Sequence, residues 1–198
     1  MFKAYDIRGI AGEELTPQFA CRLGKSIVAH LNARCIAVAR DIRESGPDLH
    51  DSFIEGVIVS GCDVMDLGIT TTGVLYRASL DLDVDVSVMI TASHNPPEYN
   101  GFKICKGTLP MAGEELQELR ETMEIGDFME GTGKLIDAQE FQRQYIERVI
   151  ENVGKPGRKI RVAIDCGNAV PGPLAIRVLE SIGVDVVPVH CTWDNKFP

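Results

Sequence analysis

The fold of this chain is decided by the stretch VDVSVMI at residues 84–90, which is apolar and rich in β-branched side chains. That composition predicts a strand covered by helices on both faces of a sheet. The polar stretch TASHNPPEYNGFK follows at once, at residues 91–103. In open α/β sheets, ligands bind outside the carboxyl ends of the strands. The second stretch therefore begins where a functional site is expected.

Apolar residues recur at strand or helix spacing along the rest of the chain. The predicted strands are residues 36–39, 63–67, 160–164 and 184–189. The predicted helices are residues 17–32, 47–60, 71–80, 113–124, 137–152 and 173–182. Strands that alternate with helices predict an α/β fold, in which a mostly parallel mixed sheet is sandwiched by helices.

The strand and helix pattern restarts after the sequence VGKPG at residues 153–157, which is typical of a linker between domains. We expect a first domain at residues 1–153 and the truncated beginning of a second, similar α/β domain at residues 154–198. About 40 residues cannot bury a core of their own without disulfides or a metal. The exposed sheet edge of such a fragment is expected to favour self-association.

The composition narrows the class of function. Hydrophobic residues make up 44% of the chain and charged residues 25%, which excludes wholesale disorder. The formal net charge is −9, so the chain as a whole would repel nucleic acid and anionic membranes. No apolar run approaches the roughly 18 residues of a membrane span, and the first residues lack the apolar core of a signal peptide. We expect a soluble, cytoplasmic protein without nucleic-acid or membrane partners.

Cysteine and histidine residues are scattered along the sequence. None of the six cysteines forms a C-x-x-C pair, so the zinc or redox centres that such pairs build are not indicated. We expect most of these thiols to behave as small buried hydrophobes. Of the four histidines, only His94 has neighbours that suggest a function.

The stretch 91–103 combines a nucleophile with a proton-handling group and polar anchors. The residues in question are Ser93, His94, Asn95, Asn100 and Lys103. Composition alone fits a surface turn equally well, because Ser, Asn, Pro and Gly all form turns. The two prolines at 96–97 are expected to hold the backbone extended, which would point the side chain of His94 away from Ser93.

Four further stretches are candidates for ligand binding. The sequences YDIRG at residues 5–9 and ARDIRES at residues 39–45 offer guanidinium groups in turns, although surface ion pairs would explain them as well. The alternating aspartates 81, 83 and 85 could hold Mg²⁺, but a solvated acidic edge beside the sheet is the expected interpretation. The sequence DCGNAVPG at residues 165–172 lacks the dinucleotide-binding pattern G-x-G-x-x-G.

Together, these motifs resemble the α-D-phosphohexomutases, most closely the bacterial phosphomannomutase/phosphoglucomutase branch. Residues 5–9 are similar to the YDIRG signature of that family, residues 40–45 to its RDxRxS turn, and residues 91–103 to its active-site loop TASHNPxxYNGFK. Residues 162–173 are similar to the VxxDxGNGxxGP opening of its second domain. Alanine stands at 39 and 169, where the family commonly has glycine.

The resemblance implies an intramolecular phosphotransferase that interconverts hexose 1-phosphate and hexose 6-phosphate, with mannose or glucose as the sugar. Ser93 would carry the phosphoryl group and pass it to the substrate, through a bisphosphate intermediate. Lys103 and Arg8 would stabilise the transferring group, with the larger acid–base role at Lys103, and His94 would lie beside the phosphoserine. The residues implied to bind substrate are Tyr5, Asn95, Asn100 and Arg40.

The resemblance also implies Mg²⁺, held in part by the phosphate on Ser93, with its remaining ligands beyond residue 198, and a hexose 1,6-bisphosphate activator. The partners would be a phosphorylated hexose and the missing parts of domains 2–4, so the isolated chain is expected to be inactive. Two alternatives stay open at this point. The chain could be a naturally short, non-catalytic module that binds phosphosugars or another protein, or a different enzyme on the same scaffold.

Overall fold

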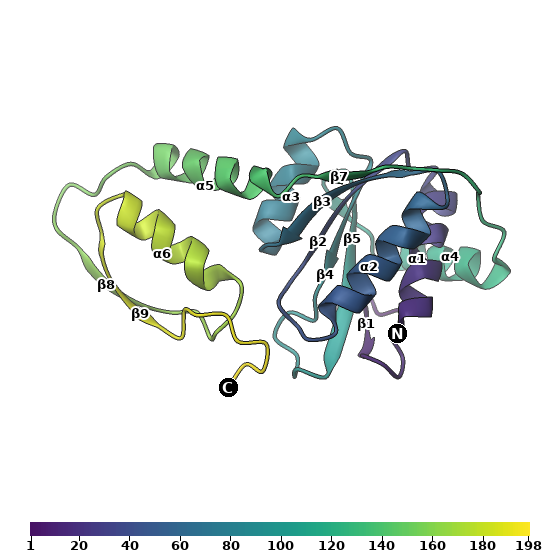
Figure 1. Cartoon of the computed structure of the whole chain (residues 1–198), viewed down its shortest axis with the longest axis horizontal. Coiled ribbons are helices and arrows are strands. Elements are labelled where there is room, and N and C mark those ends of the chain that lie inside the picture. The colour runs from purple at the N-terminus through teal and green to yellow at the C-terminus, as the bar shows by residue number, and fades with distance from the viewer.

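The computed structural model describes all 198 residues, whose elements fall into two groups (Figure 1). The strands of the first group are β1 (Ile7–Ile10), β2 (Cys35–Arg40), β3 (Asp63–Ile69), β4 (Val86–Ile90), β5 (Tyr99–Lys106), β6 (Leu109–Pro110) and β7 (Leu135–Asp137). Its helices are α1 (Pro17–Leu31), α2 (Gly46–Ile58), α3 (Thr72–Asp81), α4 (Glu114–Ile125) and α5 (Glu140–Val153). The second group is β8 (Arg161–Asp165), α6 (Pro171–Ser181) and β9 (Asp185–Val189).

The first group builds one sheet with the strand order β1-β5-β4-β2-β3-β7, and β6 pairs with β5. Strands β4, β2, β3 and β7 are parallel neighbours, whereas β5 runs antiparallel to β4, β1 and β6. Helices α1, α2 and α4 lie on one face, and α3 and α5 lie on the other (Figure 1). The predicted α/β fold with a mixed sheet between helices is confirmed. Every antiparallel pair of strands in this sheet includes β5.

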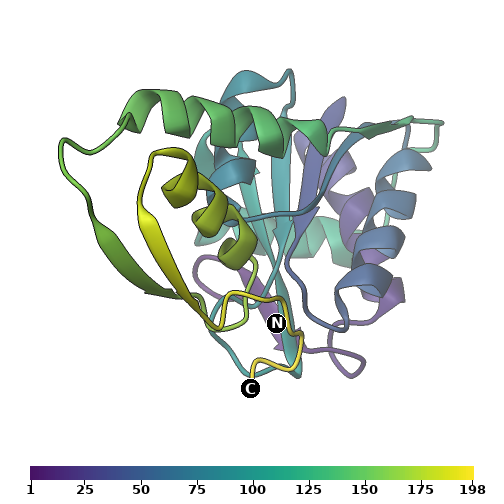
Figure 2. The ribbon, with the colours of Figure 1, turned by 60° about the vertical axis from the view of Figure 1, so that its left-hand side comes forward.

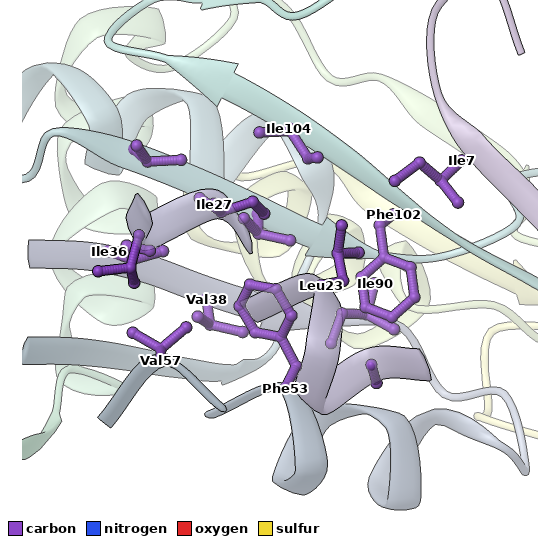
Figure 3. Packing of buried hydrophobic residues seen from close by; sticks show 14 of the residues in the cluster. Ile7, Leu23, Ile27, Ile36, Val38, Phe53, Val57, Ile90, Phe102 and Ile104 are labelled. Atoms are coloured by element: carbon purple, nitrogen blue, oxygen red, sulfur yellow. The ribbon is translucent and has the colours of Figure 1, made fainter. Parts of the chain in front are cut away.

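The core divides between the two faces of the sheet because successive side chains of a strand point to opposite sides. In β2, Ile36 and Val38 enter the larger core beneath α1 and α2, whereas Ala37 and Ala39 enter the smaller core beneath α3 and α5. Phe53 of α2 packs on Phe102 of β5 in the larger core, with ring centroids 5.8 Å apart (Figure 3). Burial of each such side chain adds about 1.5–3 kcal/mol to the free energy of unfolding.

Residues 154–198, called the second unit below, turn back after α5 and lie below that helix in both views (Figures 1 and 2). Strands β8 and β9 pair in parallel as a separate two-stranded sheet, and α6 packs against β9 and α5. Gly172 in the first turn of α6 allows close packing, because a Cβ atom there would lie only 2.1 Å from the carbonyl oxygen of Cys191. Residues 154–160, between α5 and β8, form neither helix nor strand.

None of the six helices has the length and apolar character needed to span a membrane.

The structure differs from the predicted elements at several unpredicted strands and at one helix boundary. Strand β5 occupies residues that were expected to form a loop, so only residues 91–98 of the polar stretch are irregular. The helix predicted from residue 137 begins at Glu140, because Leu135–Asp137 pairs with β3 as strand β7. The short strand β1 was also missed; it is held by pairing with β5, about 90 residues away in sequence.

Candidate active site

Ser93 lies at the exposed tip of the loop formed by residues 91–98, directly after β4. Its φ angle is 58°, in the left-handed region that few residues other than glycine adopt. Thr91 supports this conformation, because its Oγ1 accepts a 2.9 Å hydrogen bond from the Ser93 backbone N–H and donates a 2.6 Å hydrogen bond to Asp41. The strained backbone therefore presents a serine hydroxyl at the carboxyl edge of the sheet.

The guanidinium of Arg43, whose side chain is only 2% exposed, holds this loop from beneath. Its Nη1 and Nη2 atoms donate four hydrogen bonds of 2.7–3.0 Å to backbone carbonyls, those of Ser93, Asn95, Pro96 and Tyr99. Its Nε donates to Oδ2 of Asp41 at 3.2 Å, so the buried positive charge is paired. The planar fork of arginine can serve several acceptors at once, which a lysine ammonium cannot do in the same geometry.

Two cations, Arg8 and Lys103, lie beside the loop on the neighbouring strands. Strand β1 pairs with β5 so that Arg8 faces Gly101, which places Asp6 opposite Lys103. Nη2 of Arg8 lies 2.5 Å from Oδ2 of Asp6, and Nζ of Lys103 lies 3.4 Å from the same oxygen. Nη1 of Arg8 donates a 2.7 Å hydrogen bond to Oδ1 of Asn95 in the loop. The group carries a net charge of about +1, which suits a phosphoryl group.

The structure corrects the expected orientation of His94. Its Nδ1 lies 3.3 Å from Oγ of Ser93, and both side chains are exposed. The prediction that the histidine would point away from the serine was wrong, because it assumed an extended backbone. The left-handed turn at Ser93 brings the two side chains together instead.

Not all the residues that were expected to bind substrate reach the loop surface. Asn100 is fully buried and donates a 2.9 Å hydrogen bond to Oγ of Ser45, so its side chain joins β5 to the turn after β2 and does not face a ligand. Tyr5 is 74% exposed and no hydrogen bond holds its side chain. Arg40 is half-buried, and its Nη1 donates to the backbone carbonyl of Asp41 at 3.2 Å. Asn95 is the one member of this set that contacts Arg8.

A cavity of about 390 Å³ opens on the other side of Ser93. Residues 70–73, at the start of α3, line one wall, and residues 169–171 of the second unit line another. Phe197 also lines it, with its ring centroid 5.3 Å from the guanidinium carbon of Arg43. The second unit therefore contacts Arg43, the residue whose guanidinium holds the Ser93 loop.

The acidic run at 81–85 does not form a metal site. Asp81 pairs with Arg77 and Arg148, whereas Asp85 accepts hydrogen bonds from the backbone N–H groups of residues 34 and 35. No cluster of three or more His, Cys, Asp or Glu side chains in the structure could hold a metal ion. All six cysteines are free thiols.

Three residues that shape the site were not singled out from the sequence, namely Asp6, Asp41 and Arg43. Each stands inside a motif that was quoted, but only Tyr5, Arg8 and Arg40 of these motifs were given roles in the site. The order Arg–Asp–x–Arg at the end of a buried strand could have pointed to Asp41 and Arg43, because charged side chains that close to a core must be paired.

Comparison with known proteins agrees with this geometry. Residues 1–130 match the model described as phosphoglucomutase/phosphomannomutase, alpha/beta/alpha domain I. A protein of Pseudomonas aeruginosa named phosphomannomutase/phosphoglucomutase is 39% identical over the whole chain, which covers 43% of that relative. A phosphoglucomutase of Neisseria gonorrhoeae is 38% identical, with 44% of it covered. The chain thus spans less than half the length of these curated relatives.

A solved structure gives the same result in three dimensions. A phosphoglucomutase/phosphomannomutase family protein of Burkholderia thailandensis superposes with a TM-score of 0.93 at 34% identity. The superposition covers 99% of this chain and 45% of that protein. Both units of the structure therefore have counterparts in a single relative.

Proposed function

The chain belongs to the phosphoglucomutase/phosphomannomutase family, and on that premise we propose that the whole protein interconverts hexose 1-phosphate and hexose 6-phosphate, with mannose or glucose as the sugar. The observation that carries this proposal is the exposed hydroxyl of Ser93 on a left-handed turn anchored by Arg43. Phosphoryl transfer depends mainly on positioning and on neutralising charge, and this arrangement offers both.

In the proposed reaction, Ser93 carries a phosphoryl group on Oγ. The P–O bond to serine breaks while a P–O bond to the free hydroxyl of the sugar phosphate forms. The ammonium group of Lys103 gives a proton to the leaving Oγ of Ser93 and takes up the proton of that hydroxyl in return. The resulting bisphosphate then returns its other phosphoryl group to Ser93, and the proton of the serine hydroxyl passes through Lys103 to the sugar oxygen that is released. Arg8 stabilises the transferring group as a fixed positive charge.

The other side chains of the proposed site contact the substrate or the phosphoserine. His94, whose ring already lies 3.3 Å from Oγ of Ser93, contacts the substrate beside the phosphoryl group. Tyr5, Asn95 and Arg40 remain proposed substrate contacts. Because Asn100 is buried and hydrogen-bonded to Ser45, we propose that it shapes the loop from within the protein.

Mg²⁺ is the cofactor that the family resemblance implies, and the residues of this chain do not make a complete site for it. No cluster of acidic or histidine side chains fits the ion. The single ligand that we propose from this chain is the phosphate carried by Ser93. We also propose that a hexose 1,6-bisphosphate acts as activator by phosphorylating Ser93.

The division of the chain forms part of the proposal. We place the first domain at residues 1–153 and the beginning of the second at 154–198, which agrees with the separate sheet formed by β8 and β9. The chain covers 43–45% of its relatives, so catalysis is proposed for the whole protein and the isolated chain is expected to be inactive. We also propose that the protein is located in the cytoplasm.

The test uses the product of the complete source gene. Incubation with glucose 1,6-bisphosphate, followed by mass spectrometry of the peptide that contains residues 91–103, is expected to find phosphate on Ser93, and a coupled assay is expected to find mutase turnover. Ser93→Ala should lose both, whereas Ser181→Ala, at the exposed end of α6, should keep both. Binding of hexose phosphate with neither phosphorylation nor turnover would favour the non-catalytic module.

A further inference from the structure

Asp6 lies between the two cations of the site and contacts both. Its Oδ2 atom lies 2.5 Å from Nη2 of Arg8 and 3.4 Å from Nζ of Lys103. The three side chains are only 14%, 18% and 28% exposed, in the order Asp6, Arg8, Lys103, so water screens them incompletely. A single carboxylate oxygen therefore joins two positive charges that would otherwise repel each other.

The strand pairing explains why these three residues meet. Arg8 faces Gly101 across the β1–β5 ladder, and Ile7 faces Phe102, so Asp6 comes opposite Lys103. Side chains two residues apart on a strand share a face, so Arg8, opposite Gly101, lies on the same side of the sheet as Lys103. Asp6, in the bend just before β1, contacts both side chains. Gly101 has no side chain to separate them, and a Cβ atom there would lie 2.5 Å from the carbonyl oxygen of Ile7.

Asp6 holds the two cations to different degrees. Arg8 is fixed at two points, by the short contact with Asp6 and by the 2.7 Å hydrogen bond to Asn95, and its Nε is buried without a partner. Lys103 has one long contact, to Asp6. Short charge-assisted hydrogen bonds fix geometry, whereas a long contact leaves a flexible lysine free to swing. Arg8 is thus a rigid charge and Lys103 a tethered, movable one.

We propose that Asp6 is a positioning residue, whose carboxylate holds the ammonium group of Lys103 beside Arg8 and releases it to the reacting oxygen. This inference rests on the proposed function. The carboxylate cancels one of the two positive charges in the resting protein, and it keeps Lys103 within reach of the Ser93 loop. Asp6 itself forms no bond with the substrate in this scheme.

Two substitutions separate positioning by charge from simple packing. Asp6→Asn keeps the shape and removes the charge, whereas Asp6→Glu keeps the charge and changes the length. If the charge positions Lys103, Asp6→Asn in the complete protein should lower kcat by about tenfold or more, with a much smaller change in KM, and Asp6→Glu should retain more activity. If Asp6 only packs, the isosteric asparagine should be the better tolerated variant, and that result would overturn the proposal. Asp127→Asn, at an exposed aspartate after α4, is the matched control.

A second measurement needs no catalysis. The rate at which N-hydroxysulfosuccinimide acetate acylates Lys103 can be followed by mass spectrometry, with the exposed Lys106 on the same strand as internal reference. Asp6→Asn should raise the ratio of Lys103 to Lys106 labelling about threefold or more, because the tether is gone, while Asp127→Asn leaves it unchanged. An unchanged ratio in folded Asp6→Asn would overturn the proposal.

The same labelling separates this inference from the proposed function. A wild-type protein without mutase turnover contradicts the function, yet its Lys103 labelling still reports the tether. Should Asp6→Asn fail to fold, Asp6→Ser supplies the test, because the smaller hydroxyl side chain removes the carboxylate and still fits the space. The ratio of Lys103 to Lys106 labelling in that variant should exceed the wild-type ratio, and an unchanged ratio would overturn the proposal.

Discussion

Arg43, just beyond the end of β2, donates a 2.9 Å hydrogen bond from Nη2 to the backbone carbonyl of Ser93, 50 residues further along the chain. Ser93 is exposed, but its peptide unit is held by a side chain that is almost entirely buried. The geometry of the proposed nucleophile is therefore set by the packing of the sheet edge beneath it, and loosening that packing should affect the loop before it affects the rest of the fold.

Arg43→Lys tests this arrangement. An ammonium group cannot serve four carbonyls and Asp41 in the same geometry, so buried acceptors lose their donors. We expect a loss of about 2–4 kcal/mol in the free energy of unfolding, measured with urea. We also expect faster hydrogen exchange of the amides at 93–99. Arg158→Lys, at an exposed position between α5 and β8, is a control for the chemical change, and equal effects of the two variants would contradict the assigned role.

Gly101→Ala tests the close approach of β1 to β5. The added Cβ atom would lie 2.5 Å from the carbonyl oxygen of Ile7 and 3.0 Å from that of Thr91, and both are backbone atoms that cannot move aside freely. We expect the free energy of unfolding to fall by about 1–3 kcal/mol, measured by urea denaturation. Gly157→Ala is the matched control, because nothing lies within 4 Å of a Cβ atom at that position. A similar loss in both variants would argue against the β1–β5 register.

His50 is expected to make stability depend on pH. This residue of α2 is 6% exposed, and its Nε2 and Nδ1 atoms lie 3.0 Å from carboxylate oxygens of Asp66 and Asp51, respectively. Burial lowers the pKa of His50, but hydrogen bonds to the two aspartates outweigh it and raise the pKa above the ordinary 6.5. For Asp66, burial raises the pKa, but hydrogen bonds from His50 and from the backbone N–H of Gly68 outweigh it and hold the pKa below 3.8.

The direction of the pH effect follows from these two shifts. Stability contributed by His50 is fully present below pH 6.5 and is lost as the pH rises through the higher folded-state value. The contribution of Asp66 is present above pH 3.8 and is lost as the pH falls through its lower folded-state value. Urea unfolding of wild type and His50→Gln at a series of pH values above 6 should show a decline with pH in wild type alone. Parallel profiles would contradict the assigned ion pairs.

Some of the fold and of the site could be predicted from the sequence, and the missing parts have a common cause. Strand β4 and helices α1 and α2 were found because their apolar patterns are local. Strand β1 has four residues and no local signal, so it exists only through its pairing with β5. The resemblance to the family, carried by motifs in order along the chain, is confirmed by the match over residues 1–130.

Within the site, residue types could be named but their partners could not. The contact of Asp6 with Lys103 joins residues 97 positions apart and depends on an antiparallel register that no local pattern specifies. The approach of His94 to Ser93 depends on a positive φ angle that Arg43 and Thr91 hold in place through tertiary contacts. The family resemblance implied that Asn100 binds substrate, but the strand that contains it turns its side chain into the protein.

Self-association of this 198-residue chain is the last prediction. Strands β8 and β9 form a sheet of two strands, so each has an edge without a partner strand. Unpaired strand edges can pair with strands of other molecules. Pro188 hinders such pairing at β9, because proline has no backbone N–H, but β8 contains no proline. We therefore expect the edge of β8 to mediate association, seen as a rising sedimentation coefficient with concentration. Ala163→Lys places a charge at an exposed position of β8 and should reduce association, whereas Ser181→Lys at the end of α6 should not. A compact monomer at every concentration would show that the edge is protected in some other way.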